Sequence, residues 1–161
     1  MAKRNGTDQL RFTHLHLENW RNFSRIDAAL EARVFLVGPN AAGKSNLLDV
    51  FRFLHDLVAI GGGLQAAVQQ KPRDGVSSLR SLAARNPSDI VIRVRVGTEA
   101  RPQRWEYELR VTQDGKRQRP RITKERVVRD GEEILSRPLP PDAKDPERLT
   151  QTFLEQVNTN N

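Results

Sequence analysis

Hydrophobic and polar positions alternate near the start of the chain. Over residues 10–20, Leu15 and Leu17 share one face with polar residues between them, which predicts a half-buried strand. The residues over 19–24 then predict a turn. Further along, Val34–Val37 is an unbroken apolar run stopped by a glycine. Such a run is typical of a strand covered on both faces, so we expect it to be the central strand.

The spacing of apolar residues becomes helical after this run. Apolar residues recur at intervals of one, three and four, which predicts a helix packed on a sheet; they are Leu47, Leu48, Phe51, Leu54 and Val58. Three consecutive glycines over 61–63 are expected to end this helix. Two shorter helices are expected over 64–85, the second introduced by Ser77 and Ser78 as N-terminal caps.

The second half of the chain alternates with a period of two. From residue 90 onward apolar and polar side chains exchange faces at every step, and two Asp-Gly pairs are typical of hairpin turns. We therefore expect an antiparallel meander of three to four strands over 90–135. Four prolines over 137–146 exclude regular structure and indicate a linker. Asp145 and Pro146 then provide the cap and the first position of a final helix over 147–157.

Composition limits the class of protein. The chain has 161 residues, 37% of them hydrophobic, which is enough for one compact domain. Its formal net charge of +7 favours anionic partners such as phosphates. The absence of cysteine excludes disulfide scaffolds, zinc fingers and thiol catalysis, and it fits a reducing compartment. No stretch approaches the roughly 20 apolar residues of a membrane span. We therefore expect a cytoplasmic protein without a membrane partner.

The strongest candidate chemistry lies between the apolar run and the first helix, in residues 38–46, here called the phosphate loop. Residues 38–45 fit the pattern Gly, four residues, Gly-Lys-Ser. The glycines let the backbone wrap around a polyphosphate, and successive N–H groups form an anion nest at the helix N-terminus. Lys44 is expected between the β- and γ-phosphates, and Ser45 is expected to bind magnesium. The alternative is a glycine-rich turn that holds no ligand.

The predicted nucleotide-binding residues of this loop are Gly38, Pro39, Asn40, Ala41, Ala42, Gly43, Lys44, Ser45 and Asn46. The loop and the helix start read Gly-Pro-Asn-Ala-Ala-Gly-Lys-Ser-Asn-Leu-Leu-Asp, and Leu-Glu-Asn-Trp-Arg-Asn-Phe precedes them over 17–23. Together these segments resemble the opening of the ABC-type ATPase heads of the RecF, SMC and OLD group, which are P-loop ATPases of the AAA type. In that group the first strand ends in an Asn-Phe turn close to the nucleotide. The resemblance covers about residues 10–135.

The resemblance implies a fold, cofactors and partners. The fold is a mixed α/β one, the N-terminal lobe of a P-loop ATPase with an antiparallel β-meander subdomain and a C-terminal helix. The cofactors are ATP and magnesium, and the partners are DNA and a second head, either a homodimer or a partner subunit. Arg21 is implied as a contact to phosphate or base, with an ordinary solvated arginine as the alternative.

We expect residues 1–161 to form a single incomplete ATPase domain. Its parts are the strands, phosphate loop and first helix over 1–60, a helical connection over 61–88, a β-subdomain over 89–136, a linker over 137–146 and a helix over 147–157.

The residues that such heads use for hydrolysis are not found in this sequence. The heads carry four apolar residues followed by Asp-Glu, whereas the acids over 130–133 precede the apolar residues. The segment 134–138 lacks the glycines of the signature that caps a partner's γ-phosphate. We therefore expect ATP binding, with hydrolysis requiring a missing lobe. Two alternatives stay open: a nucleic-acid-binding β-module with a vestigial phosphate loop, and a small complete P-loop kinase.

A basic stretch over 116–129 offers a second candidate interface. It is opposed only by Glu125 and consists of Lys116, Arg117, Arg119, Arg121, Lys124, Arg126 and Arg129. These residues could contact a nucleic-acid backbone without reading sequence. The alternative is the solvated face of a hairpin, because the stretch contains no aromatic residue for base stacking.

Overall fold

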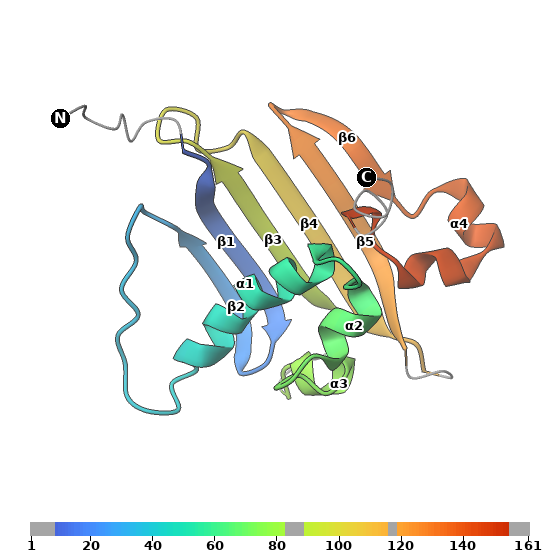
Figure 1. Ribbon diagram of the computed structural model, residues 1–161, viewed down its shortest axis with the longest axis horizontal. Helices are drawn as coiled ribbons and strands as arrows, with labels where there is room; N and C mark the ends of the chain where they lie inside the picture. Colours follow the sequence, from blue (N-terminus) through green and yellow to red (C-terminus); the bar gives the residue numbers. More distant parts are fainter. Residues whose placement is uncertain (1–8, 83–88, 116–118, 155–161) are drawn as a thin grey trace.

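The computed structural model describes residues 9–82, 89–115 and 119–154, and within these ranges six antiparallel strands form one sheet (Figure 1). Their order across the sheet is β2-β1-β3-β4-β5-β6. The strands are β1 Arg11–Trp20, β2 Phe23–Ala29, β3 Ile90–Gly97, β4 Trp105–Gln113, β5 Pro120–Arg129 and β6 Glu132–Arg137. Strands β3 to β6 confirm the expected meander, because each pairs with the next in sequence. The fold is therefore mixed α/β, as predicted.

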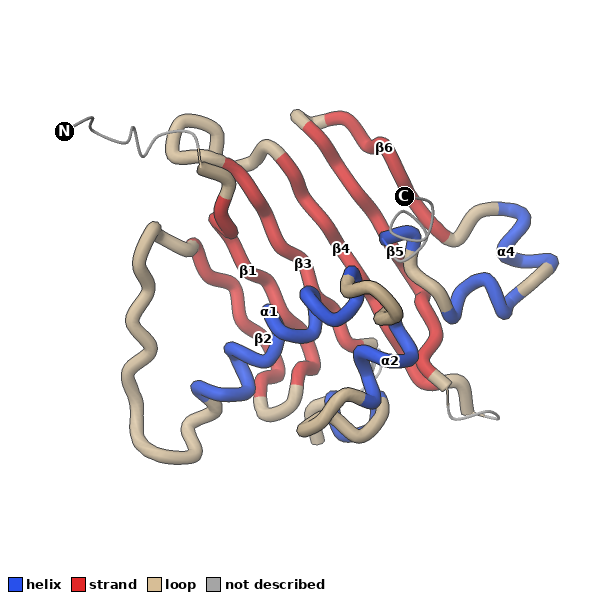
Figure 2. Tube along the Cα trace, in the orientation of Figure 1, coloured by secondary structure: helices blue, strands red, loops and turns tan. Residues whose placement is uncertain are grey.

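Three helices lie on one side of the sheet (Figure 2). They are α1 Lys44–Val58, α2 Leu64–Gln69 and α3 Val76–Leu79, which confirms the predicted first helix and the two short ones. The predicted serine caps are wrong, because the N-cap of α3 is Gly75 and both serines lie within the helix. A fourth short helix, α4 Pro140–Lys144, and a 3-10 helix, η1 Pro146–Thr150, lie beside the β5–β6 end of the sheet (Figure 1). None of the helices in the described part of the chain is long and apolar enough to cross a membrane.

The hydrophobic core lies between these helices and the sheet. Val50, Phe53 and Leu57 of α1 are buried at helical spacing, which directs one stripe of the helix onto the sheet. The strands supply the opposite side of the core through Leu15, Leu17, Ile90, Ile92, Val94, Leu109, Val111 and Ile122. Packing of this stripe holds α1 on the sheet, and it therefore also holds the phosphate loop at the N-terminus of α1 in place.

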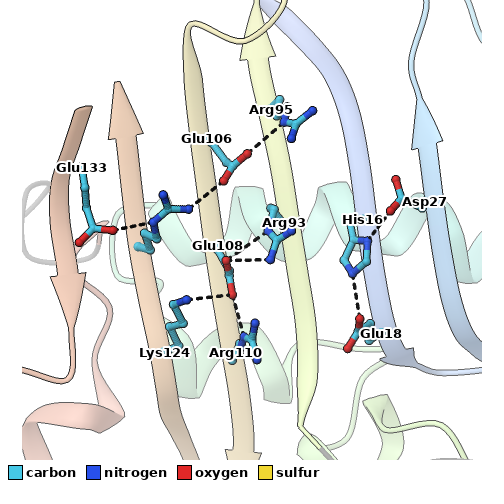
Figure 3. Close-up of polar contacts among 11 residues, drawn as sticks. His16, Glu18, Asp27, Arg93, Arg95, Glu106, Glu108, Arg110, Lys124 and Glu133 are labelled. Carbon is cyan, nitrogen blue, oxygen red and sulfur yellow. Dashed lines mark hydrogen bonds and ion pairs between the residues drawn. The ribbon is translucent and has the colours of Figure 1, made fainter. Parts of the chain in front are cut away.

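The other face of the sheet carries a ladder of ion pairs across β3, β4 and β5 (Figure 3). Arg93 lies 3.0 Å from Glu108, and Arg95 lies 3.0 Å from Glu106, each across the β3–β4 register. Burial opposes ionisation of Glu108, but hydrogen bonding to Arg110 and the nearby cations outweigh it, so the pKa of Glu108 is lowered. These cross-strand pairs explain the period of two: one face is apolar and the other is charged.

The prediction that Val34–Val37 is the central strand is wrong for the described chain. This segment is extended but belongs to none of the six strands, and Phe35 and Val37 are 84% and 93% exposed. An apolar run indicates that a segment suits burial, but it does not specify which element will cover it. Instead, β2 pairs with β1 and forms this edge of the sheet. The sequence predicted only the first residues of β2, and it predicted them as part of a turn.

The C-terminal expectations also need correction. The predicted linker over 137–146 contains α4, in which Pro140 occupies a first-turn position that requires no N–H donor. The final helix over 147–157 is not continuous, because η1 ends at Thr150 and Gln151 is extended. Asp145 does cap the segment, since its carboxylate accepts from the Glu147 N–H. Residues 155–161 lie outside the described ranges, as does Arg85 of the helical connection.

A buried polar network fastens this C-terminal segment to the sheet. The Glu125 carboxylate on β5 accepts hydrogen bonds from the Tyr107 hydroxyl at 3.0 Å and from the Phe153 N–H at 3.0 and 3.2 Å. Burial raises the pKa of Glu125 above its ordinary value of 4.5, against the opposing effect of these hydrogen bonds. Burial and the neighbouring Glu125 also raise the pKa of Tyr107 well above its ordinary range.

Replacing Glu125 with glutamine is expected to change the pH dependence of stability. A carboxyl whose pKa is raised by folding contributes most stability below its ordinary value of 4.5, and this contribution is lost as the pH rises through the raised value. The neutral amide of Glu125→Gln does not ionise. The melting temperature of the variant relative to the wild type should therefore increase as the pH is raised from 4.5 to 7. A difference that stays constant over this range would contradict the assignment, and Glu132→Gln, at an exposed carboxyl on β6, serves as the control.

Candidate functional site

The phosphate loop folds back over its own lysine. The Lys44 ammonium donates hydrogen bonds to the carbonyl oxygens of Gly38 at 2.8 Å and Pro39 at 2.7 Å. The backbone is left-handed at Ala41 (φ 64°) and at Gly43 (φ 95°). Residues in this conformation direct successive N–H groups toward one side and so make anion-binding concavities. The loop therefore surrounds a cation at the point where α1 begins.

The turn after β1 packs directly on this loop. The Asn22 side chain lies against Gly43 so closely that a Cβ atom at position 43 would lie within 3 Å of it. Asn22 also accepts a hydrogen bond from the Asn46 amide at 2.9 Å, and the indole N–H of Trp20 donates to the Asn46 carbonyl at 2.8 Å. Glycine at position 43 is thus required twice, by its positive φ and by the contact with Asn22.

Asn22 was not among the predicted site residues. The available signal was the Asn-Phe turn in the sequence, which the resemblance places near the nucleotide, but spacing alone does not connect residue 22 to residue 43. The structure brings them together because the β1–β2 hairpin ends beside the N-terminus of α1.

Arg21 points to the helix rather than to the phosphate loop. Its Nη2 and Nε atoms lie 2.9 and 3.3 Å from Oδ2 of Asp49, one turn after Ser45 on α1. Its backbone is left-handed (φ 50°), and its N–H donates to the Leu79 carbonyl at 2.6 Å. The same residue lines a groove of about 570 Å³ together with Asn22 and Asn46. Arg21 therefore borders the loop, although its ion pair is with Asp49.

Few described side chains near Ser45 could bind the predicted magnesium ion. Ser45 is exposed in the first turn of α1. The nearest acidic residue along the helix, Asp49, is buried and engaged by arginine. Among the described residues no group of three or more His, Asp or Glu side chains could hold a metal ion. The Ser45 hydroxyl is thus the exposed oxygen donor at this point of α1.

The acidic segment over 130–133 lies far from the phosphate loop in the sheet. Glu132 and Glu133 belong to β6, one edge strand, whereas the loop follows β2 at the other edge (Figure 1). His14 and His16 lie on β1, where both contact the Asp27 carboxylate, and His55 is exposed on α1. None of these residues is placed to act on a phosphate at the loop.

Ion pairs engage several cations of the basic stretch. Arg126 contacts Glu106 at 3.0 Å and Glu133 at 2.6 Å, and these carboxylates raise its pKa further. Lys124 lies 3.7 Å from Glu108. Arg129 lies over the Trp105 ring, 5.2 Å from its centroid. Lys116 and Arg117 lie outside the described residues. For Lys124 and Arg126 the geometry favours the solvated hairpin face over a nucleic-acid platform, because carboxylates already pair with these two cations.

The comparisons with known proteins support an ATPase-like nucleotide-binding domain. A family model described as "AAA domain, putative AbiEii toxin, Type IV TA system" matches residues 33–160, so the chain belongs to this AAA family of P-loop ATPases. Over 43 residues the chain is 51% identical to the DNA replication and repair protein RecF of Roseiflexus castenholzii (strain DSM 13941 / HLO8). That match covers 26% of this chain and 11% of the relative. No solved structure matches the chain significantly.

Proposed function

We propose that this chain binds ATP together with magnesium through the phosphate loop. The observation that carries the proposal is the Lys44 ammonium, held over the loop by the carbonyls of Gly38 and Pro39 at the N-terminus of α1. A lysine, a helix N-terminus and a left-handed backbone at one point all favour a polyphosphate. When bound, magnesium would be held by Ser45 and phosphate oxygens, and it would neutralise phosphate charge.

Hydrolysis is proposed to need groups beyond those described near the loop. The acids of β6 lie at the opposite edge of the sheet, and Asp49 is occupied by arginine. The segment 34–37 supports a further lobe of the head, because its four apolar side chains are all 37–93% exposed. An exposed apolar run of this kind suits coverage by another polypeptide. We therefore propose a single incomplete ATPase domain that acts with a second lobe and a second head.

Isothermal titration calorimetry with ATP and magnesium tests the binding proposal. Lys44→Ala is expected to weaken binding by at least about tenfold, because it removes charge-assisted contacts to the phosphates. Lys144→Ala, which removes an exposed lysine on α4, should bind like the wild type. Equal affinity of the wild type and Lys44→Ala would contradict the proposal. Titration with GTP in place of ATP tests the base preference.

A further inference from the structure

Asp49 is a buried carboxylate on the helix that begins at the phosphate loop. It shares one face of α1 with Phe53 and Asp56, since the three residues follow one another at helical spacing. Its side chain is 4% exposed, and two arginines from distant parts of the chain converge on it. A carboxylate that is buried beside core residues such as Phe53 costs free energy unless cations and hydrogen bonds compensate its charge.

Arg73 compensates this charge from the core side. Its side chain is only 2% exposed, and its Nη1 lies 3.6 Å from Oδ1 of Asp49. Arg73 also contacts the Asp56 carboxylate and lies over the Phe53 ring, 5.6 Å from the centroid. Asp49 is therefore paired on both sides: Oδ1 faces the buried Arg73, and Oδ2 accepts from Arg21.

The contact with Arg21 has a defined direction. Two nitrogens of one guanidinium point to the same carboxylate oxygen, which restricts the plane of the guanidinium. The backbone of Arg21 is fixed as well. Its N–H donates to the Leu79 carbonyl, and the indole N–H of the neighbouring Trp20 donates to the Asn46 carbonyl. Arg21 also lines the groove that it shares with Asn22, with Asn46 of the phosphate loop and with residues of the 77–82 segment.

We propose that Asp49, compensated by the buried Arg73, is a positioning residue that holds the Arg21 guanidinium beside the phosphate loop for contact with bound nucleotide. This inference rests on the proposed function. A buried ion pair adds little net stability compared with apolar residues, so orientation of a functional group explains its presence better than stability does. Holding Arg21 in place before the ligand arrives lowers the entropy lost on binding.

ATP titration of the full 161-residue chain tests this role with Arg21→Ala, Asp49→Asn and the double variant. Each single variant is expected to bind ATP with magnesium about tenfold more weakly than the wild type. The double variant should be no weaker than Arg21→Ala within about twofold, because Asp49 acts through Arg21. Losses that simply multiply in the double variant, or wild-type affinity of Asp49→Asn, would overturn the inference.

Two further variants separate positioning from folding. Asp56→Asn removes the other carboxylate of Arg73 and leaves the Arg21–Asp49 contact intact, so it should lower the melting temperature while ATP affinity stays within about twofold. Arg21→Lys keeps the charge but lacks the two-point contact, and it should lose most of the affinity that Arg21→Ala loses. Should Asp49→Asn fail to fold, Arg21→Lys decides, and wild-type binding by that variant overturns the inference.

The wild type and Lys44→Ala test the proposed function separately from the positioning role. If the wild type does not bind ATP, the proposed function fails and the positioning role fails with it. If the wild type binds and Lys44→Ala does not, the proposed function stands, and the Arg21 and Asp49 variants then decide the positioning role.

Discussion

Arg137→Met is expected to lower the free energy of unfolding by about 3–5 kcal/mol, because it leaves a buried carboxylate without its main partner. The Arg137 side chain is 1% exposed, and its Nη2 lies 2.8 Å from Asp142, which is equally buried. The guanidinium also donates to the carbonyls of Arg148 and Gln151, each at 2.9 Å, and lies 4.4 Å from the centroid of the Phe153 ring. One side chain thus satisfies partners from α4, η1 and the segment that follows.

Urea denaturation followed by circular dichroism measures this effect. The hydrogen bond from Arg137 lowers the pKa of Asp142 below its ordinary value of 3.8, so its contribution to stability is present above that value and is lost as the pH falls. Arg137→Met should remove this acid dependence together with the stability. Arg148→Met is the matched control, because Arg148 contacts the same carboxylate at 3.4 Å but is half exposed; it should cost no more than about 1 kcal/mol. Equal losses in the two variants would contradict the assignment.

Trp20→Ala is expected to cost about 3–5 kcal/mol, because it opens a cavity under the helix that carries the phosphate loop. Trp20 is fully buried, and its ring centroid lies 5.5 Å from that of Phe53 on α1. Its indole N–H also donates to the Asn46 carbonyl in the first turn of this helix. The residue therefore joins the end of β1 to the part of α1 nearest the loop.

Thermal and urea unfolding of Trp20→Ala, Trp20→Phe and Trp105→Ala measure the contribution of Trp20. Trp20→Phe keeps most of the ring and loses the hydrogen bond, so we expect a smaller loss of about 1–2 kcal/mol. Trp105 is half-buried on β4 beneath Arg129, and its replacement should cost less than that of Trp20. A larger loss for Trp105→Ala than for Trp20→Ala would mean that the core is not centred on α1.

The elements that the sequence predicts well are those in which apolar residues recur at a constant spacing over many residues. Helix α1 follows from the spacing of apolar residues after Leu47, and the meander follows from alternation after Ile90. The pair Asp130–Gly131 has positive φ at both residues, 49° and 88°, as its hairpin turn requires. These features depend on local geometry, which a short stretch of sequence contains.

The elements that the sequence predicts poorly depend on contacts between distant residues. Strand β2 has a weak apolar pattern and is recognisable only by its pairing with β1. The partners Asp49 and Arg73 are separated along the chain by most of α1 and α2, and each in isolation looks like a solvated charge. The loop motif identifies the candidate ligands of a phosphate, but only the fold shows that Asn22 approaches them and that Arg21 pairs with Asp49.

The order of the strands has a consequence for genetic dissection of this domain. Arg137 and the residues around it lie at the β6 edge, and the phosphate loop lies beyond the β2 edge, with the full width of the sheet between them. Sites so far apart that share no neighbours usually contribute independently. Substitutions at the β6 edge can therefore be used to change the thermodynamic stability of the domain without changing ligand binding beyond the β2 edge.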